Sequence, residues 1–135
     1  MKDETLNMDF GQQVVIETEQ QEWIASPAQG VWRKPLEREA KEHGYTSSIV
    51  KFDAGSSFKT HAHPLGEEIF VLEGVFSDEN GDYPAGTYIR NPPGSHHAPF
   101  SKEGCTLFVK LDQFGENDLT EVKINTNETL SLIHI

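Results

Sequence analysis

Two histidines and a carboxylate lie close together in the segment 55–74, which reads GSSFKTHAHPLGEEIFVLEG. His61 and His63 are separated by one residue, and Glu67 follows after a short Pro/Gly-containing stretch. Because side chains alternate between the two faces of an extended strand, these three residues share one face and Glu68 points to the other. Imidazole and carboxylate groups together suit zinc, iron, manganese, nickel or copper. The spacing therefore predicts a metal site built on one strand–turn–strand segment.

A further ligand is expected from a second segment, residues 86–97, which reads GTYIRNPPGSHH. Its Pro-Pro-Gly turn precedes His96 and His97 at the start of an expected strand. Adjacent strand residues face opposite sides, so only one of these two histidines can face inward. Either one would complete a set of three imidazoles and one carboxylate.

Strand signals recur along the chain, and helical periodicity is almost absent. Residues 36–42 have a helix-forming composition, but the stretch is short and ends at Gly44, so we expect a charged loop or a single turn there. Residues 77–83 contain an Asn-Gly pair, a strong hairpin signal. The expected strands are residues 13–17, 22–25, 31–36, 46–52, 67–72, 87–91, 97–100, 105–111 and 120–124. Short strands at this density predict an all-β sandwich or barrel.

Length and charge limit the classes of partner. A chain of 135 residues fits one domain, and it buries roughly 70% of its unfolded surface on folding. The net charge of -11 repels phosphate backbones and anionic lipid, so we expect neither nucleic acid nor a membrane as partner. The start of the chain has no apolar leader, and no stretch approaches the about 20 apolar residues of a membrane span. We therefore expect a cytoplasmic protein.

The chain has a single cysteine, Cys105, which cannot form an internal disulfide. It lies in the apolar run CTLFVKL, so we expect a buried strand residue rather than a nucleophile. His43 and His134 lie in polar or terminal stretches and are expected to be solvated.

Both histidine segments resemble the two motifs of the cupin superfamily, G(X)5HXH(X)3,4E(X)6G and G(X)5PXG(X)2H(X)3N. The positions that fit the first motif are Gly55, His61, His63, Glu67 and Gly74. The positions that fit the second are Gly86, Pro92, Gly94 and His97, with Ser101 in place of the final Asn. The resemblance implies an all-β fold with a single cupin barrel, also called a double-stranded β-helix or jelly roll. The resemblance selects Glu67 over Glu68 as the carboxylate ligand and His97 over His96 as the histidine ligand. His96 should then face away from the metal.

The central block is similar to one branch of that superfamily, the ChrR-type cupin domain, from about Trp32 to Gln113. In that branch the domain forms the C-terminal half of zinc-binding anti-sigma factors. It also forms free-standing proteins related to dihydroxyacetophenone and acetylacetone dioxygenases. The upstream helical zinc domain that would hold a sigma factor is missing here, so anti-sigma activity is not carried over. We expect one cupin domain over residues 1–135, with N-terminal strands in 13–36, a motif core at about 46–113 and a C-terminal strand and tail in 114–135.

These observations lead to two functional hypotheses. The first is a dioxygenase that acts on a small diketone or hydroxyketone bound in the barrel, with iron or zinc as the expected divalent ion and manganese or nickel as further possibilities. The second is a non-catalytic sensor, storage or regulatory module that holds the metal or a small ligand. Tyr88 and Arg90 share one face of the expected strand 87–91 and are candidates for orienting a substrate, or else for packing and an ion pair. The expected cavity wall and core include Phe52, Ile69, Val71 and Phe108.

The N-terminal strands carry more apolar residues than one sheet face needs: Val14, Val15, Ile16, Trp23 and Ile24. Trp23 and Trp32 are expected in core or subunit contacts. An exposed strand of this character is an adhesive edge, and pairing with a second copy would cover it. The sequence therefore predicts a homodimer, since two-fold association is the commonest form.

Overall fold

The structure is a computed structural model that describes residues 5–40, 43–59, 61–62, 65–112 and 122–127. Strands dominate these ranges, as the sequence pattern predicts. The elements are η1 (Thr18–Gln20), β1 (Ile24–Ala25), β2 (Val31–Ala40), β3 (His43–Phe52), β4 (Ser56–Ser57), β5 (His61–Ala62), β6 (Glu67–Asp78), β7 (Gly81–Pro84), β8 (Thr87–Asn91), β9 (His96–His97), β10 (Phe100–Ser101), β11 (Cys105–Leu111) and β12 (Val122–Asn125).

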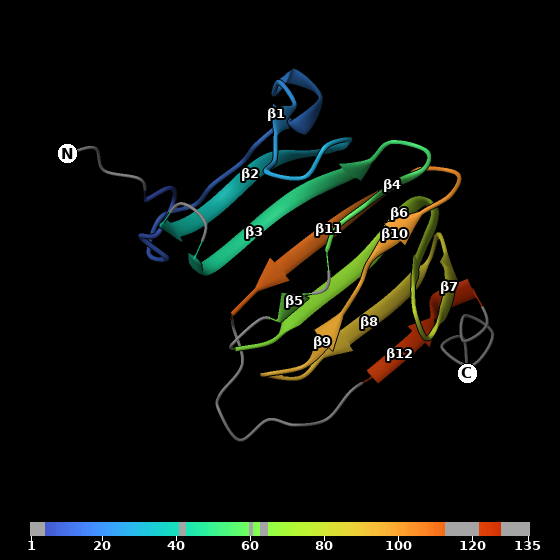
Figure 1. Ribbon diagram of the computed structural model, residues 1–135. Helices are drawn as coiled ribbons and strands as arrows, with labels where there is room; N and C mark the ends of the chain where they lie inside the picture. The colour runs from blue at the N-terminus through green and yellow to red at the C-terminus, as the bar shows by residue number, and fades with distance from the viewer. Residues whose placement is uncertain (1–4, 41–42, 60, 63–64, 113–121, 128–135) are drawn as a thin grey trace.

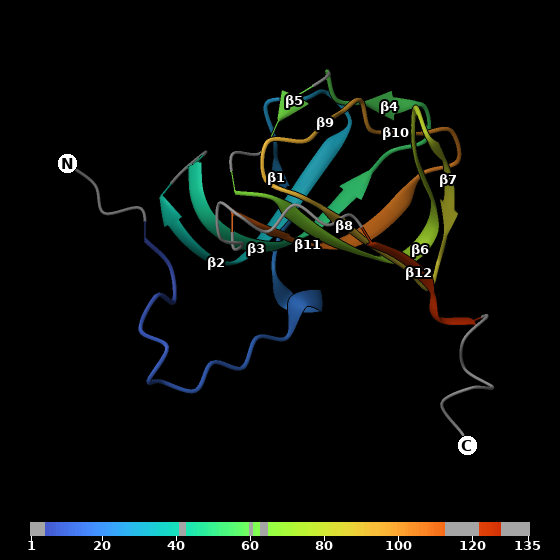
Figure 2. The same cartoon turned by 90° about the horizontal axis from the view of Figure 1, so that it is seen from below.

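Antiparallel pairing joins the strands into one large curled sheet and one small ladder. The large sheet runs in the order β1-β2-β3-β11-β6-β10-β4, with β7 and β8 also paired to β6 and β12 paired to β8. The strands β5 and β9 form a separate two-stranded ladder. In Figure 2 the long strands curl into a trough, and β5, β9, β4 and β10 lie across its other side. The all-β fold with a curled, barrel-like sheet predicted from the sequence is confirmed.

The core lies on the concave side of the trough because side chains alternate along each strand. The buried positions of β6 include Ile69 and Val71, and those of β11 are Cys105, Leu107 and Val109. Phe52 packs edge-on against Phe58 and Phe76, with ring centroids 6.0 and 5.7 Å apart.

Three of the four residues expected in the cavity wall and core are buried, namely Phe52, Ile69 and Val71. Phe108 is a correction: it pairs with Phe70 on β6 and Ile49 on β3. This parity puts it on the convex face, because the inward positions of β11 are its odd-numbered residues.

The expected boundaries of β8 and β11 are confirmed, whereas several other segments differ from expectation. Residues 36–42 do not form a loop over their described part, because β2 continues to Ala40. Two irregularities in the β2–β3 register, between Pro35 and Glu37 and between Arg38 and Ala40, let the strand stay paired. Tertiary pairing therefore overrides the helix-forming composition. Residues 41–42 lie outside the described ranges.

The N-terminal strands are shorter than expected. Residues 13–17 form no strand, and of residues 22–25 only Ile24–Ala25 pairs with β2. Isolated side-chain hydrogen bonds, and not a strand ladder, link the segment before β1 to β2. Lys34 Nζ donates to the Thr18 carbonyl over 2.6 Å, and Gln21 Nε2 donates to the Pro35 carbonyl over 2.9 Å. The expected strand 97–100 is also divided into β9 and β10, which flank Pro99, a residue without an amide donor.

The hairpin expected at residues 77–83 is confirmed. It joins β6 to β7, and Asp78 pairs with Gly81 across the loop residues Glu79 and Asn80. The loop thus lies one residue earlier than an Asn-Gly turn would place it. At the other end of the chain β12 spans Val122–Asn125, and residues 120–121 of the expected strand lie outside the described ranges. Among the described residues, no helix is long and apolar enough to cross a bilayer.

Gly74, the glycine of β6, should tolerate substitution poorly. Its φ is +76°, and an added Cβ would collide with the carbonyl oxygen of Gly104 and lie 2.9 Å from the Cα of Cys105. We expect Gly74→Ala to lower the free energy of unfolding by about 3 to 5 kcal/mol, from left-handed strain and backbone overlap together. Urea unfolding measures the change.

Gly55 provides the matched control, since its φ is +83° but a Cβ there meets nothing within 4 Å. Gly55→Ala should cost only the conformational strain, about 1 to 2 kcal/mol. Equal losses in the two variants would contradict the role assigned to the Gly74–Gly104 approach.

Candidate metal centre

Two of the predicted ligands, Glu67 and His97, meet on the concave side of the trough. Glu67 is the first residue of β6, and His97 is the last residue of β9. Both are buried, with 6% and 5% of their surface exposed. Glu67 Oε1 lies 3.1 Å from His97 Nε2. Strands from the large sheet and the small ladder thus deliver a carboxylate and an imidazole to one point.

The neighbours Glu68 and His96 face elsewhere. His96 is exposed, whereas His97 is buried. Glu68 lies on the convex face, where its Oε2 accepts a hydrogen bond from the Tyr88 hydroxyl over 2.6 Å. This burial agrees with the inward facing expected for Glu67 and His97. Their role as ligands stays a prediction.

The register of the small ladder places position 61 beside the pair. In the β5–β9 ladder residue 61 is the direct partner of residue 97, and residue 62 is that of residue 96. Directly opposed Cα atoms in antiparallel strands are about 4.5 to 5.5 Å apart. Three of the four predicted positions, 61, 67 and 97, therefore converge at the level of the backbone. The side chain of residue 61 and the whole of residue 63 lie outside what the structure describes. Without them, no group of three His, Cys, Asp or Glu side chains that could hold an ion is present in the described residues.

The spacing of the two described donors fits a shared ion. Ligands each about 2.1 Å from a first-row metal lie roughly 3.0 Å apart at a right angle and roughly 3.4 Å apart at a tetrahedral angle. The observed distance between Glu67 Oε1 and His97 Nε2 is 3.1 Å. The donor set present therefore suits a divalent transition metal.

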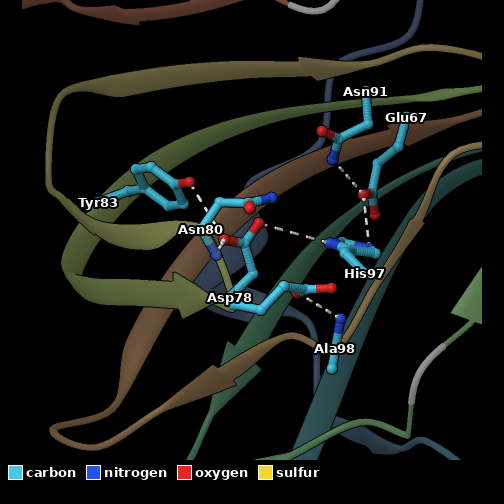
Figure 3. A network of polar contacts seen from close by, with 8 residues as sticks. Glu67, Asp78, Asn80, Tyr83, Asn91, His97 and Ala98 are labelled. Carbon is cyan, nitrogen blue, oxygen red and sulfur yellow. Dashed lines mark hydrogen bonds and ion pairs between the residues drawn. The ribbon is translucent and has the colours of Figure 1, made fainter.

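Two further polar residues contact this pair, and sequence reasoning did not identify either of them (Figure 3). Asn91 Nδ2 donates to Glu67 Oε1 over 3.2 Å, from the position directly opposite Glu67 on β8. Asp78 Oδ2 lies 4.0 Å from His97 Nδ1, on the other side of the ring. Strand parity could have indicated Asn91, because it is on the inward face of the predicted strand 87–91. Asp78 comes near His97 because β10, which follows His97, pairs with the end of β6 through Phe100 and Ser77.

Opposing effects set the charge state of His97. Burial of the ring disfavours its protonation and lowers the pKa of His97. The close Glu67 carboxylate, followed by the charges of Asp78 and Glu79, outweighs burial, so the pKa lies above its ordinary value. In the absence of a metal, the site therefore favours a cation at this imidazole.

A hollow of about 1810 Å³ opens beside Glu67 and His97. Its walls include the apolar residues Phe52, Ile69, Phe76, Leu107 and Val109. This volume exceeds the roughly 300 to 1,000 Å³ of typical ligand pockets, because the hollow includes the open side of the trough. An apolar wall around a polar pair is a common arrangement for a small-molecule site.

Tyr88 and Arg90, the candidates for orienting a substrate, lie on the wrong face for that role. In the β6–β8 register Tyr88 pairs with Phe70 and Arg90 with Glu68, whereas Glu67 pairs with Asn91. Residues 88 and 90 therefore point to the convex side, away from the Glu67–His97 pair. This placement corrects the expectation of a site role and agrees with the alternative of packing and polar contacts.

Cys105 is buried on the inward face of β11, as predicted. Burial raises the pKa of its thiol to about 11, so the thiol stays protonated and is a poor nucleophile at neutral pH.

Comparison with known proteins gives a family match that covers most of the chain. Residues 11–115 match the model of a family described as the ChrR Cupin-like domain. A DNA damage-repair/toleration protein of Arabidopsis thaliana, DRT102, is 33% identical over 73 residues, which is 50% of this chain. The chain spans only 24% of the length of that relative.

Two solved structures are similar in fold. An acetylacetone dioxygenase from Acinetobacter johnsonii superposes with a TM-score of 0.59 and 17% identity, over 90% of this chain and 91% of that chain. The complex of Rhodobacter sphaeroides SigE with the anti-sigma ChrR gives a TM-score of 0.59 and 22% identity, over 70% of this chain and 50% of that chain. At these identities the likeness shows the fold alone.

The raised pKa of His97 leads to a prediction for the metal-free protein. A raised folded pKa means that the stabilising contribution is fully present below the unfolded value of about 6.5 and is lost as pH rises through the folded pKa. Glu67→Gln should lower the pKa of His97, because it removes the nearest negative charge. Glu68→Gln, on the convex face, should leave that pKa unchanged. NMR titration of the histidine ring protons measures both, and equal shifts in the two variants would contradict the assignment.

Proposed function

This chain belongs to the ChrR cupin-like domain family, and on that premise we propose that it is a metal-binding cupin whose ligands are His61, His63, Glu67 and His97. The observation that carries the proposal is the buried contact of 3.1 Å between Glu67 Oε1 and His97 Nε2. The register that sets residue 61 opposite residue 97 supports it. The ion is a divalent transition metal, with iron or zinc first and manganese or nickel next.

The leading reaction is dioxygenation of a small diketone or hydroxyketone. His61, His63, Glu67 and His97 would hold the ion, and a redox-active ion held there would supply Lewis-acid and oxygen chemistry. The chain itself contributes the apolar walls of Phe52, Ile69 and Leu107 to the space beside Glu67 and His97. Asn91 holds the Glu67 carboxylate in its orientation. The similar fold of an acetylacetone dioxygenase supports this reaction class.

A non-catalytic sensor or regulatory module is the second candidate. The specific observation in its favour is that Tyr88 and Arg90 lie on the convex face, which removes both sequence candidates for a substrate-orienting group. In this alternative the same ligands hold a closed zinc site that stabilises the barrel. The similarity in fold to the complex of SigE with the anti-sigma ChrR supports the regulatory module.

The wider setting of the protein follows from its charge and its cysteine. We propose that the chain is a single cupin domain that works in the cytoplasm on a small molecule held in the hollow. A net charge of -11 disfavours nucleic acid and anionic membranes as partners. The lone buried thiol is compatible with a reducing compartment.

The metal proposal predicts a sharp contrast between neighbouring residues. His63→Ala, Glu67→Gln and His97→Ala should each lose stoichiometric metal, because each removes a ligand. His96→Ala and Glu68→Gln should retain it, because residues 96 and 68 are the outward neighbours of two ligands. Elemental analysis of protein purified without added metal measures the content. Metal lost from the outward variants and kept by the Glu67 and His97 variants would refute the site.

The reaction proposal predicts a dependence on the identity of the metal. Iron-reconstituted protein should consume oxygen in the presence of pentane-2,4-dione or a hydroxyketone, and the zinc form should stay at background because zinc has no redox chemistry. An oxygen electrode measures the rates. If the iron form is equally inactive while metal raises the melting temperature, the regulatory module is the better description.

We also propose that the protein is a homodimer joined through its N-terminal segment. Phe10, Val14, Val15 and Ile24 are exposed large apolar residues, and Val15 has 79% of its surface exposed. The short β1 lies at one edge of the large sheet and leaves its outer side open to pairing. A second copy would cover both features.

Two single substitutions to glutamate, one at Val15 and one at Gln13, test the dimer. Val15→Glu should weaken self-association by at least tenfold in sedimentation equilibrium, because it puts a charge in an apolar contact. Gln13→Glu adds the same charge at a neighbouring exposed position and should have a smaller effect. A wild-type protein that stays monomeric at high micromolar concentration would rule the dimer out.

A further inference from the structure

The turn that leads into Glu67 is bound by the residue that follows β11. Leu111 is the direct partner of Glu67 in the β6–β11 ladder, so the next residue, Asp112, lies opposite Gly66 (Figure 1). The backbone amide of Asp112 donates to the Gly66 carbonyl over 2.8 Å. Its side-chain Oδ1 accepts a hydrogen bond from the backbone amide of Leu65 over 2.9 Å. Asp112 therefore binds both residues that directly precede the candidate ligand Glu67.

Asp112 makes these two bonds from a backbone conformation that few side chains adopt. Its φ is +58°, and Asn7 is the other non-glycine residue with a positive φ in the described part of the chain. The left-handed region is unfavourable for a residue with a Cβ, and Asp and Asn tolerate it best because their short polar side chains bond locally. Such conformations persist where the surrounding contacts determine them, and they cluster at functional sites.

The contact lies in the corner of the hollow that holds the Glu67–His97 pair. The residues of this corner that line the hollow are Leu65, Glu67, Leu111 and Asp112. Glu67 is the first residue of β6, so the backbone at Leu65 and Gly66 sets the point at which β6 begins. Asn91 binds the Glu67 carboxylate from β8. Asp112 thus restrains the backbone that carries the ligand candidate, and Asn91 restrains its carboxylate.

We propose that Asp112 is a positioning residue of the metal centre, which places Glu67 by holding the backbone of Leu65 and Gly66. The inference rests on the proposed metal-binding function. Ligands have to be held within about 0.5 Å of their productive positions, and loss of a partner that orients a ligand weakens metal binding by about 10- to 100-fold. Asp112 acts through the backbone and not on the carboxylate itself, so we expect the lower end of that range.

The first test uses two substitutions that separate the side-chain hydrogen bond from the charge and from the backbone strain. Asp112→Gly adopts the positive φ freely but has no acceptor for the Leu65 amide. Asp112→Asn keeps an acceptor oxygen and tolerates the same φ, but it has no charge. Zinc affinity is measured by competition with a chelator at fixed pH. We expect the zinc Kd to rise about tenfold for Asp112→Gly and to stay within about threefold for Asp112→Asn.

Asn7 provides the matched control. Its φ is +55°, and its Nδ2 donates to the Leu36 carbonyl over 2.7 Å. This contact is made to β2, which β3 and β11 separate from β6 in the sheet. Asn7→Gly therefore removes a similar hydrogen bond at a similar φ, and it should change the zinc Kd by less than about twofold. Equal zinc Kd values for the wild type and Asp112→Gly would show that Asp112 only shapes a turn, and equal losses in both Asp112 variants would assign the effect to charge.

The second test reads the contact in metal-free protein by amide hydrogen exchange. The Leu65 amide should be protected in the wild type and in Asp112→Asn, and it should exchange at least about tenfold faster in Asp112→Gly. The amide of residue 112, which donates to the Gly66 carbonyl, is the internal reference and should stay protected in all three proteins. A Leu65 amide that is unprotected in the wild type would contradict the contact itself.

The outcomes separate this inference from the proposed function. A wild type that binds zinc, with an unchanged zinc Kd in Asp112→Gly, would overturn the role of Asp112 and leave the metal site intact. A wild type that binds no zinc, iron, manganese or nickel would overturn both. If Asp112→Gly does not fold, the wild type and Asp112→Asn still decide, because an unprotected Leu65 amide in the wild type, or a tenfold loss of zinc affinity in Asp112→Asn, contradicts the proposal.

Discussion

The burial of a carboxylate beside an imidazole is the constraint on which the site depends. Moving either charged group out of water is expensive, and the cost is recovered only when partners are held in place. Glu67 and His97 come from strands that do not pair with each other, one in the large sheet and one in the small ladder. Their 3.1 Å contact therefore depends on how the ladder closes over the trough. The Phe52, Phe58 and Phe76 cluster and the β6–β7 hairpin are the contacts that set this closure.

On β11, β6 and β8, a cross-strand row that carries Glu67 and Asn91 lies beside an apolar row. Glu67 has Leu111 as its partner on β11 and Asn91 as its partner on β8. The next inward row, Val109, Ile69 and Ile89, is entirely apolar. A one-residue slip of β6 would replace Glu67 by Glu68 and turn Ile69 outward, so the apolar row enforces the register that keeps the ligand candidate inside. The same register of β6 is therefore required for packing the core and for placing Glu67 inside.

The sequence was most informative where local periodicity and long-range pairing agree. Alternation alone predicted the inward facing of Glu67, and the motif resemblance selected His97, which the structure buries. Residues 36–40 were predicted wrongly as a charged loop or turn, because long-range pairing with β3 extends β2 through them. Residues 13–17 were predicted wrongly because an apolar, β-prone composition does not ensure a ladder partner. Asp78 escaped prediction because its approach to His97 depends on the long-range pairing of β10 with β6, which spacing does not encode. The placement of His63 and the side chain of His61 remains a sequence prediction.

The two carboxylates around His97 have opposite consequences for an ion and for a proton. Their negative charge attracts a divalent cation, but the same charge stabilises the imidazolium and raises the pKa of His97. A protonated ring cannot donate a lone pair, so binding of the ion must displace a proton from Nε2. Asp78 lies beside the other ring nitrogen, with Oδ2 4.0 Å from Nδ1, and adds to the negative charge around the imidazole. Glu67 is the nearer carboxylate, with Oε1 3.1 Å from Nε2, so the charge that would attract an ion is also the charge that favours a proton at that nitrogen. Removal of that proton is therefore the step that an ion bound at this pair would have to drive.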